Sequence, residues 1–182
     1  VRKALNLSLD RNVITDKVLG QGQTPTYVFT PTYIEEGHLI QQPAYSKEPM
    51  AQRNEEAIKL LEEAGYSKAN PLKFSILYNT NENHKKVAIA AASMWKANTK
   101  GLIDVKLENQ EWKTYIDSRR AGRYDAARAG WNADYNQATT FGNYFLSNSS
   151  NNTAKYANPE YDKAIAESYV ATDAEGRAKA YA

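Results

Sequence analysis

The segment at residues 72–129 constrains the fold most, because its hydrophobic residues change repeatedly between the period of a strand and the period of a helix. Apolar and polar side chains alternate in a strand with one buried face, whereas apolar side chains recur every three or four residues along a helix. The predicted strands cover 72–78, 102–107 and 124–129, and the predicted helices between them cover 82–98 and 111–121. This order with short connections predicts an α/β fold, with a mostly parallel sheet flanked by helices.

The remaining sequence predicts further helices and one long loop. Helical sequence covers 1–9, 13–18, 54–64, 140–146 and 159–169, and a capping box at 172–175 begins a last helix. Asp10 is expected to cap the helix at 13–18 and Gly20 to end it, whereas Asn54 is expected to cap the helix at 54–64.

Residues 21–49 are predicted to form an irregular packing loop. Four prolines interrupt this stretch, and four aromatic side chains suit it to packing: Tyr27, Phe29, Tyr33 and Tyr45. We expect residues 1–182 to form a single domain. Because both ends lie in helical sequence, we also expect the chain to be a piece of a longer protein.

Composition excludes several classes of function. The formal net charge is +2 and the basic residues are scattered, so a nucleic-acid partner is not indicated. No apolar run approaches the roughly 20 residues that span a bilayer, so a membrane-spanning segment is not expected. Cysteine is absent, which excludes zinc–thiolate sites and cysteine nucleophiles within these residues. No metal-ligand spacing and no glycine-rich phosphate loop occurs, so we expect no metal, no cofactor and no enzymatic activity.

Polar and aromatic residues follow each predicted strand. Residues 79–81, 109–112 and 128–134 come directly after the three strands, and open parallel sheets bind ligands at the carboxyl ends of their strands. Arg128 and Asp134 are suited to the two ends of a zwitterion, with Trp131 as an apolar wall between them. The alternative is an ordinary ion pair on a surface loop.

Two predicted helices add candidates at the same edge. His84 lies one turn into the helix at 82–98, and its alternative is a solvated helix start. Trp112 and Arg119 are seven residues apart and therefore share a helical face. The alternative for Trp112 is a position in the core.

Two other functions fit the same residues. Tryptophan, tyrosine and asparagine side chains also suit a sugar or glycan receptor. Glu111 and Asp134 are candidates for the acid and base of a glycosidase, which needs two carboxylates. No nucleophile lies beside a base in the sequence, which disfavours catalysis.

Three segments in this order, at 1–11, 57–66 and 130–135, resemble the periplasmic oligopeptide-binding proteins of bacterial ABC importers, solute-binding protein family 5. The resemblance covers essentially the whole chain and is strongest to the branch that binds murein tripeptide. It implies a lobe of the type II periplasmic-binding-protein fold, namely most of the C-terminal lobe of a two-lobed protein. The implied partners are a short peptide, the missing N-terminal lobe and an inner-membrane ABC permease. The implied role is peptide transport or peptidoglycan recycling in the periplasm.

The resemblance also implies a role for each candidate site residue. Asp134 would hold the amino terminus of the peptide, and Arg128 would meet its carboxylate. Arg119 and His84 would take part according to the length of the ligand. The remaining candidates are the expected pocket-wall residues Trp112 and Trp131, and Asn132, which stands where the oligopeptide-binding branch has cysteine. General oligopeptides and murein tripeptide both remain open as ligands.

Overall fold

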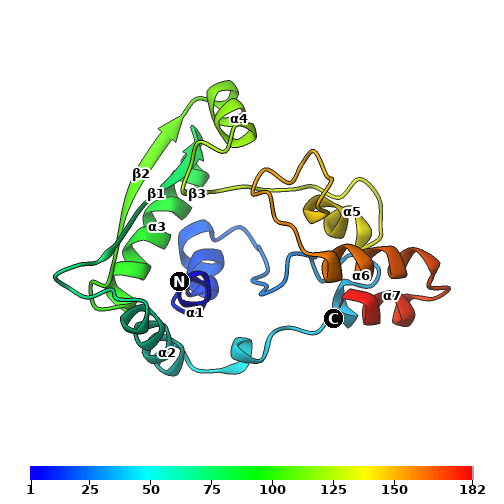
Figure 1. The fold of residues 1–182 in the computed structure, drawn as a ribbon, viewed down its shortest axis with the longest axis horizontal. Coiled ribbons are helices and arrows are strands. Elements are labelled where there is room, and N and C mark those ends of the chain that lie inside the picture. The colour runs from blue at the N-terminus through cyan, green and yellow to red at the C-terminus, as the bar shows by residue number, and fades with distance from the viewer. Residues whose placement is uncertain (182) are drawn as a thin grey trace. The chain divides into compact units, whose positions relative to one another are not determined.

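The computed structural model describes residues 1–181, which form two compact units (Figure 1). The first unit consists of residues 1–25 and 44–129, and the second consists of residues 26–43 and the residues from 130 onward. The loop predicted at 21–49 is therefore divided between the two units.

The first unit contains a parallel three-stranded sheet, as predicted. Its strands are β1 (Leu72–Asn79), β2 (Ile103–Gln110) and β3 (Ala126–Ala127), in the order β2-β1-β3. The central strand β1 pairs with β2 over its full length, from Leu72 opposite Ile103 to Asn79 opposite Gln110. Because all pairs are parallel, the three carboxyl ends lie at one edge of the sheet.

The third strand is shorter than the predicted 124–129. Only Ala126 and Ala127 pair with β1. Before them, the carboxylate of Asp125 accepts hydrogen bonds from the backbone N–H and the hydroxyl of Ser75, so a side chain replaces the backbone ladder there. After them, the N–H of Arg128 still donates to the carbonyl of Leu77 at 2.8 Å, and the chain then leaves the sheet.

Helices pack against this sheet and against one another. The helical segments of the first unit are α1 (Arg2–Leu7), η1 (Val13–Leu19), η3 (Ala44–Lys47), α2 (Met50–Glu63), α3 (Glu82–Asn98) and α4 (Trp112–Arg120). The main core contains buried residues of β1 and β2 together with residues of α1, α2 and α3, among them Leu7, Leu61, Ile76 and Trp95. Burial of these apolar surfaces supplies the main favourable free energy of the unit.

The helix ends of the first unit follow the sequence signals with one exception. Asp10 accepts a hydrogen bond from the N–H of Val13, and Gly20 ends η1 with a φ of 61°, which glycine adopts without strain. The prediction that α2 begins at Asn54 is wrong. The carbonyl of Pro49 already accepts from the N–H of Arg53, so the helix begins at Met50.

The second unit is built from short helices and loops. Its helical segments are η2 (Gly37–Leu39), α5 (Thr139–Gly142), η4 (Asn143–Phe145), α6 (Pro159–Val170) and α7 (Ala174–Tyr181). Ile34, Ile40, Ala138 and Phe141 form its small core. The loop aromatic Phe29 contacts the rings of Phe141, Tyr144 and Phe145, as a packing loop requires.

Two details of the second unit differ from the predictions. Tyr33 does not pack, because 79% of its surface is exposed. The cap of the last helix is Asp173, whose carboxylate accepts from the N–H of Gly176 at 2.7 Å. The predicted box placed the cap one residue earlier, at Thr172, and the first helical residue is Ala174.

Candidate functional site

His84 is held at the carboxyl edge of the sheet by the first turn of α3. Asn81 caps this helix, and its side-chain oxygen accepts from the N–H of His84 at 3.1 Å. The Nδ1 atom of His84 lies 2.7 Å from the side-chain oxygen of Asn79, which is buried at the end of β1. The imidazole is therefore oriented by its contact with Asn79 and is partly buried.

The environment of His84 favours its neutral form. Burial lowers the pKa of His84 below its ordinary value of 6.5, and the positive charge of Arg128 lowers the pKa further. An amide oxygen accepts hydrogen bonds, so the contact with Asn79 requires a hydrogen on Nδ1. The Nε2 atom then remains as the second polar atom of the ring.

Arg128 is fixed on both sides of its backbone. Its N–H donates to Leu77, and its carbonyl accepts a hydrogen bond from the hydroxyl of Tyr115. The guanidinium is partly buried, and this burial lowers the pKa of Arg128, as does the nearby charge of Arg119. Among residues 1–181, Arg128 takes part in no salt bridge.

The helix α4 presents an aromatic and cationic face, as its spacing predicted. The ring of Tyr115 is buried, with the ring of Trp112 at a centroid distance of 5.7 Å and the guanidinium carbon of Arg119 5.5 Å from its centroid. Trp112 is 57% exposed, so the alternative that placed it in the core is wrong. Glu111 caps this helix, because its carboxylate accepts from the N–H of Lys113 at 3.0 Å.

The first unit thus brings four predicted site residues to one edge: His84, Trp112, Arg119 and Arg128. Arg128 acts electrostatically on His84, and Arg119 acts on Arg128. This edge is suited to bind a ligand that carries a carboxylate beside an apolar group. It offers two guanidinium groups, a neutral imidazole and an exposed indole.

The second unit holds the other three predicted residues on one loop. The indole N–H of Trp131 donates to the carbonyl of Thr140 at 2.9 Å, and the ring packs edge-on against Tyr144. The N–H of Asp134 donates to the hydroxyl oxygen of Thr140 at 2.9 Å. The side chains of Asn132 and Asp134 are exposed, and within residues 1–181 Asp134 forms no salt bridge.

Sequence reasoning missed two groups that organise these elements. The hydroxyl of Tyr115 donates a hydrogen bond to the backbone carbonyl of Arg128. The carboxylate of Glu36 binds the N–H of Ala138, just after the Asp134 loop. No sequence signal marks Glu36, because its partner Arg177 is 141 residues away.

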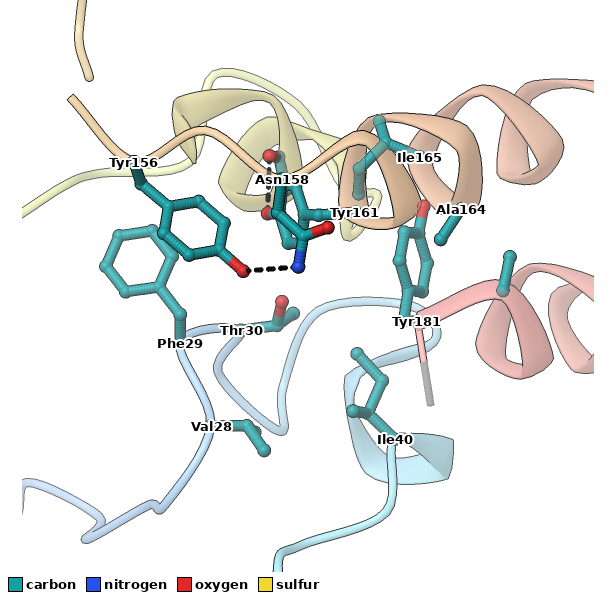
Figure 2. Close-up of a pocket in the computed structure, with 12 residues that line it drawn as sticks. Val28, Phe29, Thr30, Ile40, Tyr156, Asn158, Tyr161, Ala164, Ile165 and Tyr181 are labelled. Atoms are coloured by element: carbon teal, nitrogen blue, oxygen red, sulfur yellow. Dashed lines mark hydrogen bonds between the residues drawn. The ribbon is translucent and has the colours of Figure 1, made fainter. Parts of the chain in front are cut away.

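The second unit also contains a cavity of about 300 Å³. Figure 2 shows it between α6, α7 and the loop that carries Val28, Phe29 and Thr30. None of the seven predicted site residues lines it. Tyr161 at its wall donates to the carbonyl of Gly142 at 2.7 Å, so this part of the cavity wall is tied to the end of α5.

Between residues 1 and 181, no cluster of three or more histidine, aspartate or glutamate side chains has the arrangement of a metal site. No helix in that part of the chain combines the length and the apolar character needed to span a membrane.

Solved structures of similar proteins share this fold over the whole chain. The structure of Haemophilus influenzae OppA in complex with the peptide RPPGFSPFR matches with a TM-score of 0.96 and 97% identity, over 100% of this chain and 35% of that chain. The murein tripeptide-binding protein MppA, in its unliganded open form, matches with a TM-score of 0.93 and 44% identity, over 100% of this chain and 35% of that one. These neighbours confirm the predicted type II periplasmic-binding-protein architecture.

Curated relatives agree with the structures. The chain is 98% identical to the periplasmic oligopeptide-binding protein OppA of Haemophilus influenzae, over 100% of the chain and 34% of that protein. It is 47% identical to the periplasmic murein peptide-binding protein MppA of Escherichia coli, over 92% of the chain and 30% of that protein. The chain therefore spans about a third of the length of these relatives, and its identity to the oligopeptide binder is the higher of the two.

The model of the bacterial extracellular solute-binding proteins, family 5 Middle, matches residues 1–153. That match covers well over half of the chain and includes all seven predicted site residues. The chain belongs to the bacterial extracellular solute-binding proteins, family 5.

Proposed function

We propose that the chain is part of the solute-binding component of a bacterial ABC importer, which captures short peptides in a cleft between two lobes. The observation that carries this proposal is the partly buried guanidinium of Arg128, which has no salt bridge among the described residues. A desolvated cation without a partner is costly. The carboxylate of a peptide would offset that cost through charge-assisted hydrogen bonds.

The other candidate residues take complementary roles in this proposal. Asp134 binds the amino terminus of the peptide, since its exposed carboxylate lies on a loop whose backbone is fixed. Arg119 and His84 contribute to carboxylate binding according to ligand length. Trp112, Trp131 and Asn132 provide pocket walls for side chains.

The relatives support this reading. OppA of Haemophilus influenzae, the protein solved with RPPGFSPFR, is described as a periplasmic oligopeptide-binding protein. MppA is described as a murein peptide-binding protein. Both are named as binding proteins, so we propose no catalytic role for this chain.

The proposal extends to the whole protein. We place the full-length protein in the periplasm, where an inner-membrane ABC permease receives the peptide after hinge closure between the lobes. The chain supplies most of the C-terminal lobe, with both compact units as parts of that single lobe. The N-terminal lobe provides the other wall of the cleft.

Isothermal titration of the full-length protein with murein tripeptide and with tri-lysine tests this function. Tight binding of murein tripeptide alone would identify a receptor for cell-wall recycling, whereas comparable binding of both would identify a general oligopeptide receptor. Absence of binding to a panel of short and murein-derived peptides would refute the proposal.

A sugar receptor is the second candidate, because the exposed Trp112 also suits stacking against a sugar ring. Asp134→Ala separates the two. It should strongly weaken binding of a ligand with a free ammonium group and matter less for a neutral sugar.

The glycosidase alternative is weaker, since the carboxylate of Glu111 caps α4. Turnover of an aryl glycoside would support the glycosidase alternative.

A further inference from the structure

Glu36 is a fully buried carboxylate in the second unit. Its Oε1 atom accepts a hydrogen bond from Nε of Arg177 at 2.5 Å, and its Oε2 atom accepts one from the N–H of Ala138 at 3.1 Å. Arg177 belongs to α7, and Ala138 directly precedes α5. Each oxygen of Glu36 therefore holds a different segment of the unit.

The residues after Ala138 hold the loop that carries Asp134. Thr140 accepts from the N–H of Asp134 through its hydroxyl and from the indole of Trp131 through its carbonyl. Thr139 accepts from the hydroxyl of Tyr135. Both threonines are buried. These three hydrogen bonds therefore attach the loop to the first turn of α5.

A second contact joins the same two segments. The N–H of Glu35 donates to the side-chain oxygen of Asn136 at 3.1 Å. Glu35 also lies 3.5 Å from Arg177, at the exposed side of the buried pair. The segment at 35–36 thus binds the side chain of Asn136 and the backbone N–H of Ala138, on either side of residue 137.

We propose that the ion pair of Glu36 and Arg177 positions Asp134 for binding the amino terminus of the peptide. This inference rests on the proposed function, in which Asp134 binds that group. A charge-assisted hydrogen bond is directional, so its strength depends on how firmly the carboxylate is placed. Glu36 touches no ligand in this arrangement. It acts through Ala138 and Thr140.

The chemistry of Glu36 makes the inference testable with a substitution of equal size. Glutamine has a single acceptor oxygen, whereas glutamate has two. In Glu36→Gln the charge of Arg177 should attract that oxygen, which leaves the N–H of Ala138 facing an amide donor. Adding Arg177→Met removes the competing cation, so the glutamine oxygen is free to accept from Ala138.

The experiment compares two ligands of the full-length protein, tri-lysine and N-acetyl-tri-lysine, by isothermal titration. The readout is the ratio of their affinities, which isolates recognition of the free amino terminus. We expect Glu36→Gln to lower this ratio on the order of tenfold through weaker binding of the free peptide alone. Glu36→Gln with Arg177→Met should restore much of the ratio. Leu61→Ala, a core substitution in the first unit, should lower the unfolding temperature without changing the ratio.

An unchanged ratio in folded Glu36→Gln would overturn the proposal and leave the pair a purely structural role. If that variant does not fold, Arg177→Lys decides. It keeps the positive charge and loses the Nε donor, so we expect a smaller fall in the ratio, and an unchanged ratio overturns the proposal. Failure of the proposed function is distinguishable, because the unmodified protein would then bind neither peptide.

Discussion

The imidazole of His84 and the side-chain amide of Asn79 form a 2.7 Å contact that joins the first turn of α3 to the end of β1. Asn79 is buried, so this contact also satisfies a polar group that water cannot reach. Because Arg128 acts on the same imidazole, the protonation of His84 is coupled to the charge of the candidate site.

The first prediction concerns acid sensitivity. Burial and Arg128 lower the pKa of His84 below 6.5, so the unfolded chain binds a proton at a higher pH than the folded protein does. The free energy of unfolding should therefore decrease as the pH falls below about 6.5 and through the lower folded pKa. His84→Gln should reduce this decrease, measured by urea unfolding of the full-length protein at about pH 7.5 and about pH 5.

His38 provides the matched control, since it is exposed on η2. His38→Gln should leave the pH dependence as it is in the unmodified protein. If both substitutions have the same effect, the contact with Asn79 and the charge of Arg128 do not govern the acid sensitivity.

The second prediction concerns the hydroxyl of Tyr115, which donates to the carbonyl of Arg128. Tyr115→Phe keeps the ring that contacts Trp112 and Arg119 and removes only this donor. We expect a loss of about 1 kcal/mol in the free energy of unfolding, the usual value of a hydrogen bond. The affinity for a peptide should also fall, because Arg128 loses one of its two backbone anchors. Both quantities are measured by urea unfolding and by titration calorimetry.

Tyr33→Phe removes a hydroxyl from an exposed tyrosine and serves as the control for this second prediction. Its unfolding and its peptide affinity should match those of the unmodified protein. Normal peptide binding in Tyr115→Phe would mean that the carbonyl contact is not needed to place Arg128.

The third prediction concerns the close approach of α5 and α6 at Gly142. A Cβ atom at this position would lie 2.7 Å from Cδ1 of Ile165, which is buried in α6. Gly142→Ala should therefore destabilise the protein by about 1–3 kcal/mol, as overpacking usually does. Ile165→Val lacks the Cδ1 atom and should itself cost about 1 kcal/mol.

A double-mutant cycle makes this prediction specific. The pair Gly142→Ala and Ile165→Val should be more stable than the sum of the single effects predicts, since the valine removes the atom that the alanine meets. Additive effects in urea unfolding would show that the space at Gly142 is not limited by Ile165.

The sequence was sufficient for the parallel sheet because local periodicity fixes strands and helices, and short connections fix their direction. It also placed Trp112 and Arg119 on one face of α4, because that relation depends only on helical geometry. The start of β3 was predicted too early, since the side chain of Asp125 accepts the hydrogen bond of the Ser75 N–H there in place of a backbone carbonyl. The hydrophobic periodicity of a sequence does not show where a side chain replaces a backbone hydrogen-bond partner.

Contacts between residues that lie far apart in the sequence could not be predicted from the sequence. The partner of Glu36 is Arg177, and the two lie in segments joined only by the folded second unit. Asn79 was placed at the correct edge, but its contact with His84 depends on the turn between β1 and α3. Residue type and spacing therefore located the candidate site residues, whereas their supporting contacts required the structure.

The fourth prediction concerns the ionisation of Tyr161. Burial raises the pKa of Tyr161 from 10.0 to about 12, with smaller contributions from Tyr156 and Asp162. The unfolded chain thus loses this proton at a lower pH than the folded protein does. The contribution of Tyr161 to stability should be complete below about pH 10 and should be lost as the pH rises towards about 12.

Absorbance titration of the full-length protein tests this value directly. Subtracting the titration of Tyr161→Phe from that of the unmodified protein should isolate one phenol that ionises near the raised value, as long as the protein remains folded. The same substitution also removes the hydrogen bond to the carbonyl of Gly142, so it should cost about 1 kcal/mol at neutral pH. If the isolated phenol instead titrates near the ordinary tyrosine value, Tyr161 is solvated. The 2.7 Å hydrogen bond from its hydroxyl to the carbonyl of Gly142, which joins α6 to the end of α5, would then not form.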